Sequence, residues 1–102
     1  MVRIPAHREP THPGEMLSEE FLKPLGISQR HLADAIHVPY RQVNEVVNRR
    51  RGITAGTALR LSYYFGNSPE FWISLQNRWD LFQVMRDEAK ELNRIRPLRS
   101  ES

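Results

Sequence analysis

Residues 29–48, QRHLADAIHVPYRQVNEVVN, decide the fold of this 102-residue chain. Apolar residues recur at helical spacing on both sides of a break at His37-Val38-Pro39, which predicts helices at Gln29–Ile36 and Tyr40–Asn48 joined by a three-residue turn. Ser28 is a suitable N-cap for the first of them. His37 stands where such a turn is often left-handed, a conformation that histidine tolerates at some cost. The expected buried face consists of Leu32, Ala33, Ile36, Val43, Val46 and Val47.

Two short helices joined in this way predict a helix-turn-helix motif, in which the second helix enters the major groove of DNA. One face of that helix is buried on its partner, and Tyr40, Arg41, Asn44, Glu45 and Asn48 remain on the free face. Arg41 and Asn44 are the best candidates for base contacts, because arginine pairs with guanine O6/N7 and asparagine with adenine N6/N7. The candidate DNA-contacting residues are Ser28, Gln29, Arg30, Tyr40, Arg41, Gln42, Asn44, Asn48, Arg49, Arg50 and Arg51.

These candidates are expected to differ in role. Tyr40 and Gln42, near the start of the second helix, could reach bases or phosphates. Residues 28–30 begin the first helix, where backbone amides and polar side chains commonly hold a phosphate. The run Arg49-Arg50-Arg51 follows the recognition helix and is expected to touch the DNA backbone, although a solvated charged loop is the alternative.

The distribution of charge also favours nucleic acid. The net charge is only +3, but residues 28–60 carry six arginines against Asp34 and Glu45, while residues 61–93 are acidic overall. Thirteen of the fifteen basic residues are arginine, whose planar fork suits phosphate and guanine. The absence of cysteine excludes disulfides and thiolate metal sites, and a reducing cytoplasm is the expected compartment. Neither a membrane span nor a secretory leader is evident.

The remaining pattern predicts a single all-α domain of five helices at residues 12–93, between a flexible arm at 1–11 and a basic flexible tail at 94–102. The first helix is expected over 14–23, closed by Pro24 and Gly26, and the fourth runs from a Thr54 cap to Gly66. The fifth is a single long helix over about 69–93, capped by Ser68. Its expected apolar face carries Phe71, Leu75, Phe82, Met85, Ala89 and Leu92, with Trp72 and Trp79 beside it.

Other chemistries find little support. The four histidines lack the spacing of two metal ligands on one helix face, so neither a metal nor a cofactor is expected. Glu19 and Glu20 diverge on a helix and form no catalytic pair. The sequence has no phosphate-binding glycine loop and no nucleophile motif, so an enzyme is not expected. Trp72 and Trp79 could stack on single-stranded bases, but their spacing favours core or dimer contacts.

Several motifs in order resemble the HigA/VapI-type antitoxins of the Xre/Cro helix-turn-helix family. The resemblance covers about residues 10–92, and its motifs are HPGEML (12–17), EFLKPLGISQ (20–29), RGIT (51–54), TALRL (57–61) and FGNSPEFWISLQN (65–77). It implies a lambda-repressor-like fold and the antidote half of a bacterial type II toxin–antitoxin pair. The implied partners are a RelE-like mRNA-cleaving toxin, a second copy of the chain joined through carboxy-terminal helices, and a palindromic operator in its own operon.

The chain departs from that family at Asn48-Arg49-Arg50, where relatives often carry a glycine, so the turn and the backbone contacts there are expected to differ. No residue pattern marks a toxin-binding surface. A stand-alone or phage-type repressor with the same DNA chemistry therefore remains the main alternative. An enzyme or a pure interaction module is the third.

Overall fold

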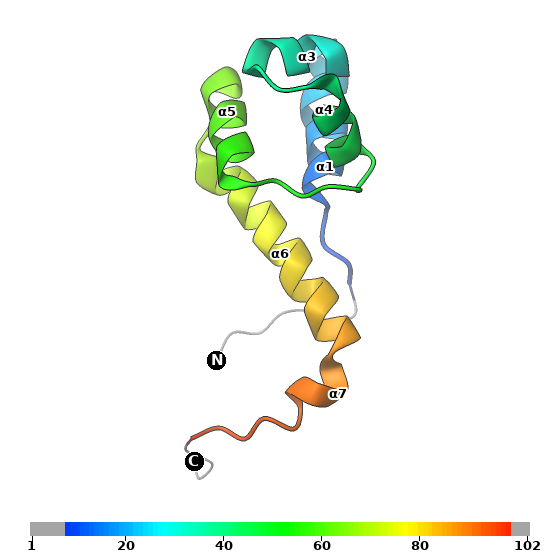
Figure 1. The fold of residues 1–102 in the computed structure, drawn as a ribbon, viewed down its shortest axis with the longest axis vertical. Coiled ribbons are helices and arrows are strands. Elements are labelled where there is room, and N and C mark those ends of the chain that lie inside the picture. Colours follow the sequence, from blue (N-terminus) through cyan, green and yellow to red (C-terminus); the bar gives the residue numbers. More distant parts are fainter. Residues whose placement is uncertain (1–7, 99–102) are drawn as a thin grey trace.

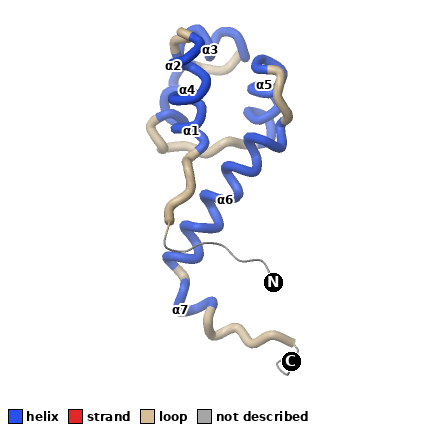
Figure 2. The backbone as a smooth tube through the Cα atoms, turned by 180° about the vertical axis from the view of Figure 1, so that it is seen from behind, coloured by secondary structure: helices blue, strands red, loops and turns tan. Residues whose placement is uncertain are grey.

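The computed structural model describes residues 8–98 and is all-helical, with no strand in that part of the chain (Figures 1 and 2). A group of short helices forms a compact head, and the long helix α6 leads away from it toward the carboxy terminus (Figure 1). The molecule measures 55 × 22 × 22 Å. Residues 1–7 of the predicted arm and 99–102 of the predicted tail lie outside the described residues. Within the described part, no helix has the length and apolar character needed to cross a membrane.

The first helical run is longer than predicted. It comprises α1 (Pro13–Met16), the π-helical segment η1 (Leu17–Leu22) and α2 (Lys23–Leu25), and it ends at Gly26, whose φ is 67°. The prediction that Pro24 closes this helix is wrong. Proline has no N–H to offer the carbonyl of Glu20, and the chain accommodates it by wider hydrogen bonding, in which the Lys23 amide donates to the Ser18 carbonyl.

The two helices of the predicted motif are present as α3 (Gln29–Ile36) and α4 (Tyr40–Val47), with Asn48 as the C-cap of α4. The Ser28 hydroxyl accepts the His31 amide at 3.0 Å and caps α3 as expected. His37 has φ 61°, so the predicted left-handed turn is confirmed. The side chain of Arg60 supports this strained corner by donating to the Ile36 carbonyl at 2.8 Å.

The carboxy-terminal half of the described chain contains α5 (Ala55–Phe65), α6 (Pro69–Asp87) and α7 (Ala89–Leu92). Thr54 and Ser68 cap α5 and α6 as predicted, and Gly66 ends α5 with φ 79°. The prediction of one helix over 69–93 is wrong, because Glu88 leaves helical geometry at φ −117° and separates α6 from α7. Acidic residues are unfavourable at the negative end of a helix and favourable at a helix start, which is consistent with a break at Asp87-Glu88.

One hydrophobic core holds the head together. Trp72 at its centre is fully buried, and its indole N–H donates to Asn67 Oδ1 at 3.1 Å, so it has no free face on which a base could stack. Phe21 packs against the Trp72 and Phe65 rings at centroid distances of 5.0 and 4.8 Å. The buried members of the core are Leu17, Leu22, Leu32, Ala33, Ile36, Val43, Val46, Ile53, Ala58, Leu61, Trp72 and Leu75.

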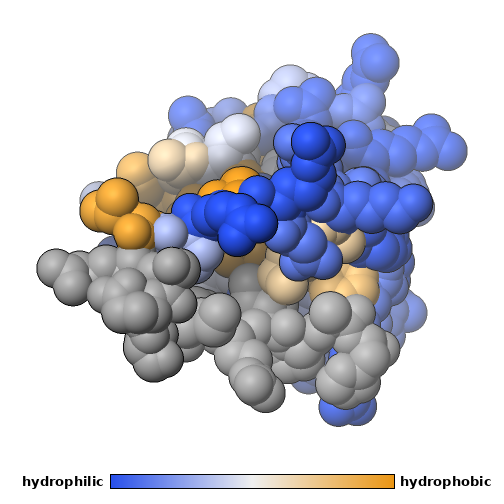
Figure 3. Space-filling model, turned by 90° about the horizontal axis from the view of Figure 1, so that it is seen from below, coloured by the Kyte–Doolittle hydropathy of each residue, from blue (hydrophilic) through white to orange (hydrophobic). Residues whose placement is uncertain are grey.

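Only the first half of α6 packs into this core. Beyond it, Phe82 is buried, but the predicted apolar face does not continue, because Ala89 and Leu92 are exposed. Viewed from this end, the surface shows hydrophobic residues interspersed with strongly hydrophilic ones (Figure 3). The exposed large apolar side chains along this segment are Leu81, Val84, Leu92, Ile95 and Leu98.

Candidate nucleic-acid interface

Helix α4 is fixed on one side and presents polar groups on the other. Val43 and Val46 are buried in the core, and Val47 is half-buried beside them. Gly14 at the start of the first helical run lies so close to the end of α4 that an added Cβ would be 2.7 Å from the carbonyl carbon of Val46. Contacts with α3 on one side and α1 on the other therefore hold α4 rigidly, as a helix that enters a groove requires.

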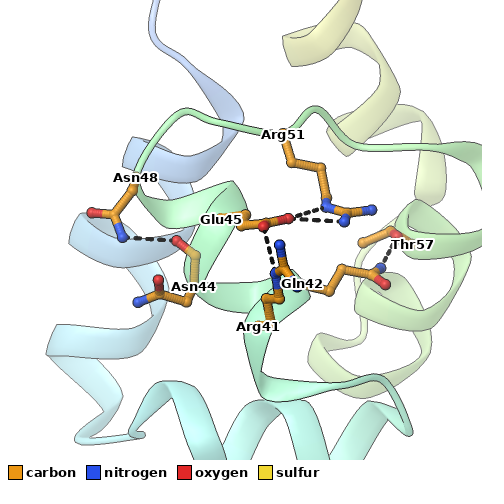
Figure 4. A network of polar contacts seen from close by, with 7 residues as sticks. All are labelled: Arg41, Gln42, Asn44, Glu45, Asn48, Arg51 and Thr57. Carbon is orange, nitrogen blue, oxygen red and sulfur yellow. Dashed lines mark hydrogen bonds and ion pairs between the residues drawn. The ribbon is translucent and has the colours of Figure 1, made fainter.

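A carboxylate with two guanidinium partners lies on the polar face of α4 (Figure 4). Arg41 Nε donates to Glu45 Oε2 at 2.9 Å, and Arg51 donates to Glu45 Oε1 through Nε at 2.9 Å and lies 2.8 Å from it through Nη2. The hydrogen bonds from Arg51, and then those from Arg41, lower the pKa of Glu45 below its ordinary value. Glu45 is therefore a carboxylate at neutral pH, and the three side chains together carry one net positive charge.

Asn44 ties α4 to the start of α3. Its Nδ2 donates to Gln29 Oε1 at 3.0 Å and lies 3.4 Å from the Tyr40 hydroxyl. The Arg30 guanidinium stacks over the Tyr40 ring, 4.6 Å from its centroid. One turn further on, Asn48 Nδ2 donates to the Asn44 carbonyl at 2.9 Å (Figure 4). The structure thus brings five of the predicted site residues together on one polar surface.

Two predicted site residues have their side-chain groups engaged within the protein. Gln42 is half-buried, and its Nε2 donates to Thr57 Oγ1 on α5 at 3.0 Å (Figure 4). The Ser28 hydroxyl is engaged by the His31 amide at the start of α3. Both side chains therefore position the elements that carry the surface, and the amide of Gln29 and that of Arg30 remain without a partner inside their own helix.

The three consecutive arginines after α4 diverge. Arg49 takes a left-handed backbone with φ 62°, and its guanidinium is 3.0 Å from Glu15 and lies over the Trp79 ring at 5.5 Å. Arg51 turns back to Glu45. Arg50 is exposed and forms no ion pair with any residue of the described part. A run that looks uniform in sequence therefore provides three different environments.

Residues that the sequence analysis did not assign to the site support it from behind. Gln76 on α6 accepts the Ile53 amide at 2.7 Å and so anchors the loop that follows the arginines. His12 is buried, caps α1 by accepting the Gly14 amide at 2.9 Å, and meets Trp79 edge to face at 4.8 Å. Burial, and then the charge of Arg49, lower the pKa of His12 below its ordinary value. These contacts join residues far apart in the chain, and no local pattern marks them.

The described residues contain no cluster of histidine, aspartate or glutamate that could hold a metal ion. The polar surface of α4 therefore consists of donors and acceptors with the chemistry of base edges and phosphates.

Comparison with known proteins agrees with this geometry. A family model described as helix-turn-helix matches residues 19–72. Virulence-associated protein I of Dichelobacter nodosus is 46% identical over 91 residues, which cover 89% of this chain and 83% of that protein. Antitoxin HigA-1 of Vibrio cholerae is 37% identical over 91 residues, which cover 89% and 86%. The Pseudomonas aeruginosa antitoxin HigA, solved with the higBA promoter, matches with a TM-score of 0.85 at 40% identity, over 89% of this chain and 100% of that one. This chain belongs to the HigA family of helix-turn-helix antitoxins.

Proposed function

We propose that this chain binds a palindromic operator in double-stranded DNA as a homodimer, represses its own operon and neutralises a RelE-like mRNA-cleaving toxin in the cytoplasm. The observation that carries the DNA-binding part is the rigid seating of α4. Its valines are buried in the core, while its opposite face presents Arg41, with a side chain that is 86% exposed, beside Asn44 and Tyr40. The Pseudomonas relative solved with promoter DNA supports the same use of this fold.

The geometry supports a division of labour among the candidate residues. We assign base contacts to Arg41 and Asn44, whose donors suit guanine and adenine respectively. Phosphate contacts are assigned to the first turn of α3, at Gln29 and Arg30, and to the exposed Arg50. The remaining predicted residues complete the surface, either through their own exposed groups or by fixing its shape; they are Ser28, Tyr40, Gln42, Asn48, Arg49 and Arg51.

The dimer is proposed to form through α6 and α7. Five large apolar side chains are exposed along this segment, and a monomer gains nothing from leaving them in water. A two-fold axis there would place two copies of α4 about 34 Å apart, one turn of the double helix. The predicted operator is therefore a palindrome whose half-site centres are about 10 base pairs apart or a multiple of this spacing.

Selection from a random pool of DNA duplexes tests the first part of the proposal. The full chain is incubated with the pool, bound duplexes are amplified, and the enriched sequence is compared with the DNA upstream of the chain's own reading frame. We expect a palindrome with the predicted spacing, present in that upstream DNA and protected in a footprint. Failure to enrich any sequence would refute specific DNA binding.

Co-expression tests the second part. The short reading frame beside this one is induced in cells with and without the chain, while growth and mRNA integrity are followed. Growth arrest with mRNA cleavage, relieved by this chain and accompanied by co-purification of the two proteins, is the expected result. Absence of arrest, or arrest that the chain does not relieve, would remove the toxin and leave a stand-alone repressor.

A further inference from the structure

Resting on the proposed function, the geometry points to Glu45 as a specificity-determining residue that positions Arg41 for a guanine and keeps Arg51 from binding phosphate non-specifically. Glu45 has no place among the base or phosphate contacts, since an unpaired carboxylate on this surface would repel the DNA backbone. Ion pairs at the protein surface contribute little to folding stability, so stability does not explain the arrangement. The arrangement needs a reason in binding.

The way in which Arg41 is held leaves its reading end open. Only its Nε contacts Glu45, at 2.9 Å, and neither terminal nitrogen has a hydrogen-bond partner among the described residues. Those two nitrogens are the pair that reaches guanine O6 and N7 together. The contact to Glu45 therefore restricts the long side chain, whose freedom would otherwise have to be lost on binding, without using the donors that read the base.

Arg51 is held in a different way. Its Nε and Nη2 both approach one oxygen of Glu45, at 2.9 and 2.8 Å, so one edge of its guanidinium is already occupied (Figure 4). Its side chain is 46% exposed, against 86% for Arg41. The paired charge is less available to phosphate, and a protein that neutralises fewer phosphates binds every sequence more weakly.

The test compares Glu45→Gln with the wild type on the enriched operator and on a scrambled duplex of equal length, over a series of salt concentrations. The substitution keeps the size of the side chain and removes its charge. We expect tighter binding to the scrambled duplex, with a salt slope steeper by about 0.9 for each additional phosphate that the variant neutralises. The ratio of the two affinities should fall about tenfold, within the roughly 5- to 150-fold that a bidentate arginine–guanine pair contributes.

Glu19→Gln is the matched control. Glu19 pairs with Lys23 at 2.7 Å with the same four-residue spacing, lies on the first helical run, and loses the same unit of charge. Its affinity ratio should equal that of the wild type. An unchanged ratio and slope in Glu45→Gln would overturn the inference, whereas a wild-type chain without any sequence preference would refute the proposed function itself.

A double-mutant cycle separates positioning from direct reading by Glu45. In the Arg41→Ala background, Glu45→Gln should no longer alter discrimination at the base pair that Arg41 reads, because the side chain that it positions is gone. If Glu45→Gln alters discrimination there by the same factor with and without Arg41, the carboxylate itself reads the base, and the positioning role is wrong. Circular dichroism and Tm of each variant confirm that all of them are folded.

Discussion

Replacing Gly14 by alanine should damage both the stability of this protein and its recognition helix. The added Cβ would lie 2.7 Å from the Val46 carbonyl carbon and 3.0 Å from Val47 Cα, and closer still to the Val46 carbonyl oxygen. Ordinary contacts between carbon atoms are about 3.5–4.0 Å, so α1 and the end of α4 must separate by about 1 Å. The opposing atoms belong to the backbone and have no rotamer to which they could move. We therefore expect a loss of about 2–3 kcal/mol, toward the upper end of the range for overpacking.

Thermal unfolding and operator binding measure this effect together. In a domain of this size, 2–3 kcal/mol corresponds to a Tm lower by about 10–20 °C. Gly56→Ala is the control, because a Cβ there meets only Thr54 Oγ1, at 4.0 Å, and alanine favours the α5 helix. Its Tm should be unchanged or slightly higher. A Gly14→Ala protein with wild-type Tm and operator affinity would refute the close packing of α1 on α4.

Three further predictions follow from particular residues. Arg50→Ala should weaken binding to operator and scrambled duplexes alike and flatten the salt slope by about 0.9, whereas retention of the full slope would exclude a phosphate contact. Stability should be full above about pH 6.5 and fall below it, because the unfolded chain then binds a proton that buried His12 resists; His12→Asn, which can still cap α1, should lose this part of the pH dependence in a series of Tm measurements. His37→Gly should raise stability by about 1 kcal/mol in urea denaturation, since glycine adopts φ 61° without strain; a destabilised variant would contradict this.

The parts of the fold that local chemistry specifies could be predicted from the sequence. Ser28, Thr54 and Ser68 cap helices because their hydroxyls accept an amide three residues later, which depends on neighbouring residues alone. The break at His37 and the buried valines of α4 follow equally from short-range pattern. These features define the helix-turn-helix motif, and with it the surface that was expected to meet DNA.

The errors have a different origin. The passage of the first helical run through Pro24 depends on a change in hydrogen-bond register, and the break at Glu88 has no glycine or proline to mark it. The separate environments of Arg49 and Arg51 arise from contacts with Glu15, Trp79 and Glu45 across the fold. Such contacts are set by how the helices pack, and a run of identical residues carries no signal of them.

Base-pair discrimination by Arg41→Ala tests the central claim, that α4 reads DNA, most directly. Affinities of the wild type and the variant are measured for the operator and for its single-base-pair substitutions at fixed salt. The account predicts a loss of about 1–3 kcal/mol on the operator, with discrimination abolished at one guanine-containing base pair and its symmetry mate and retained elsewhere. A variant that binds the operator as tightly as the wild type, or that weakens uniformly at every position, would contradict it.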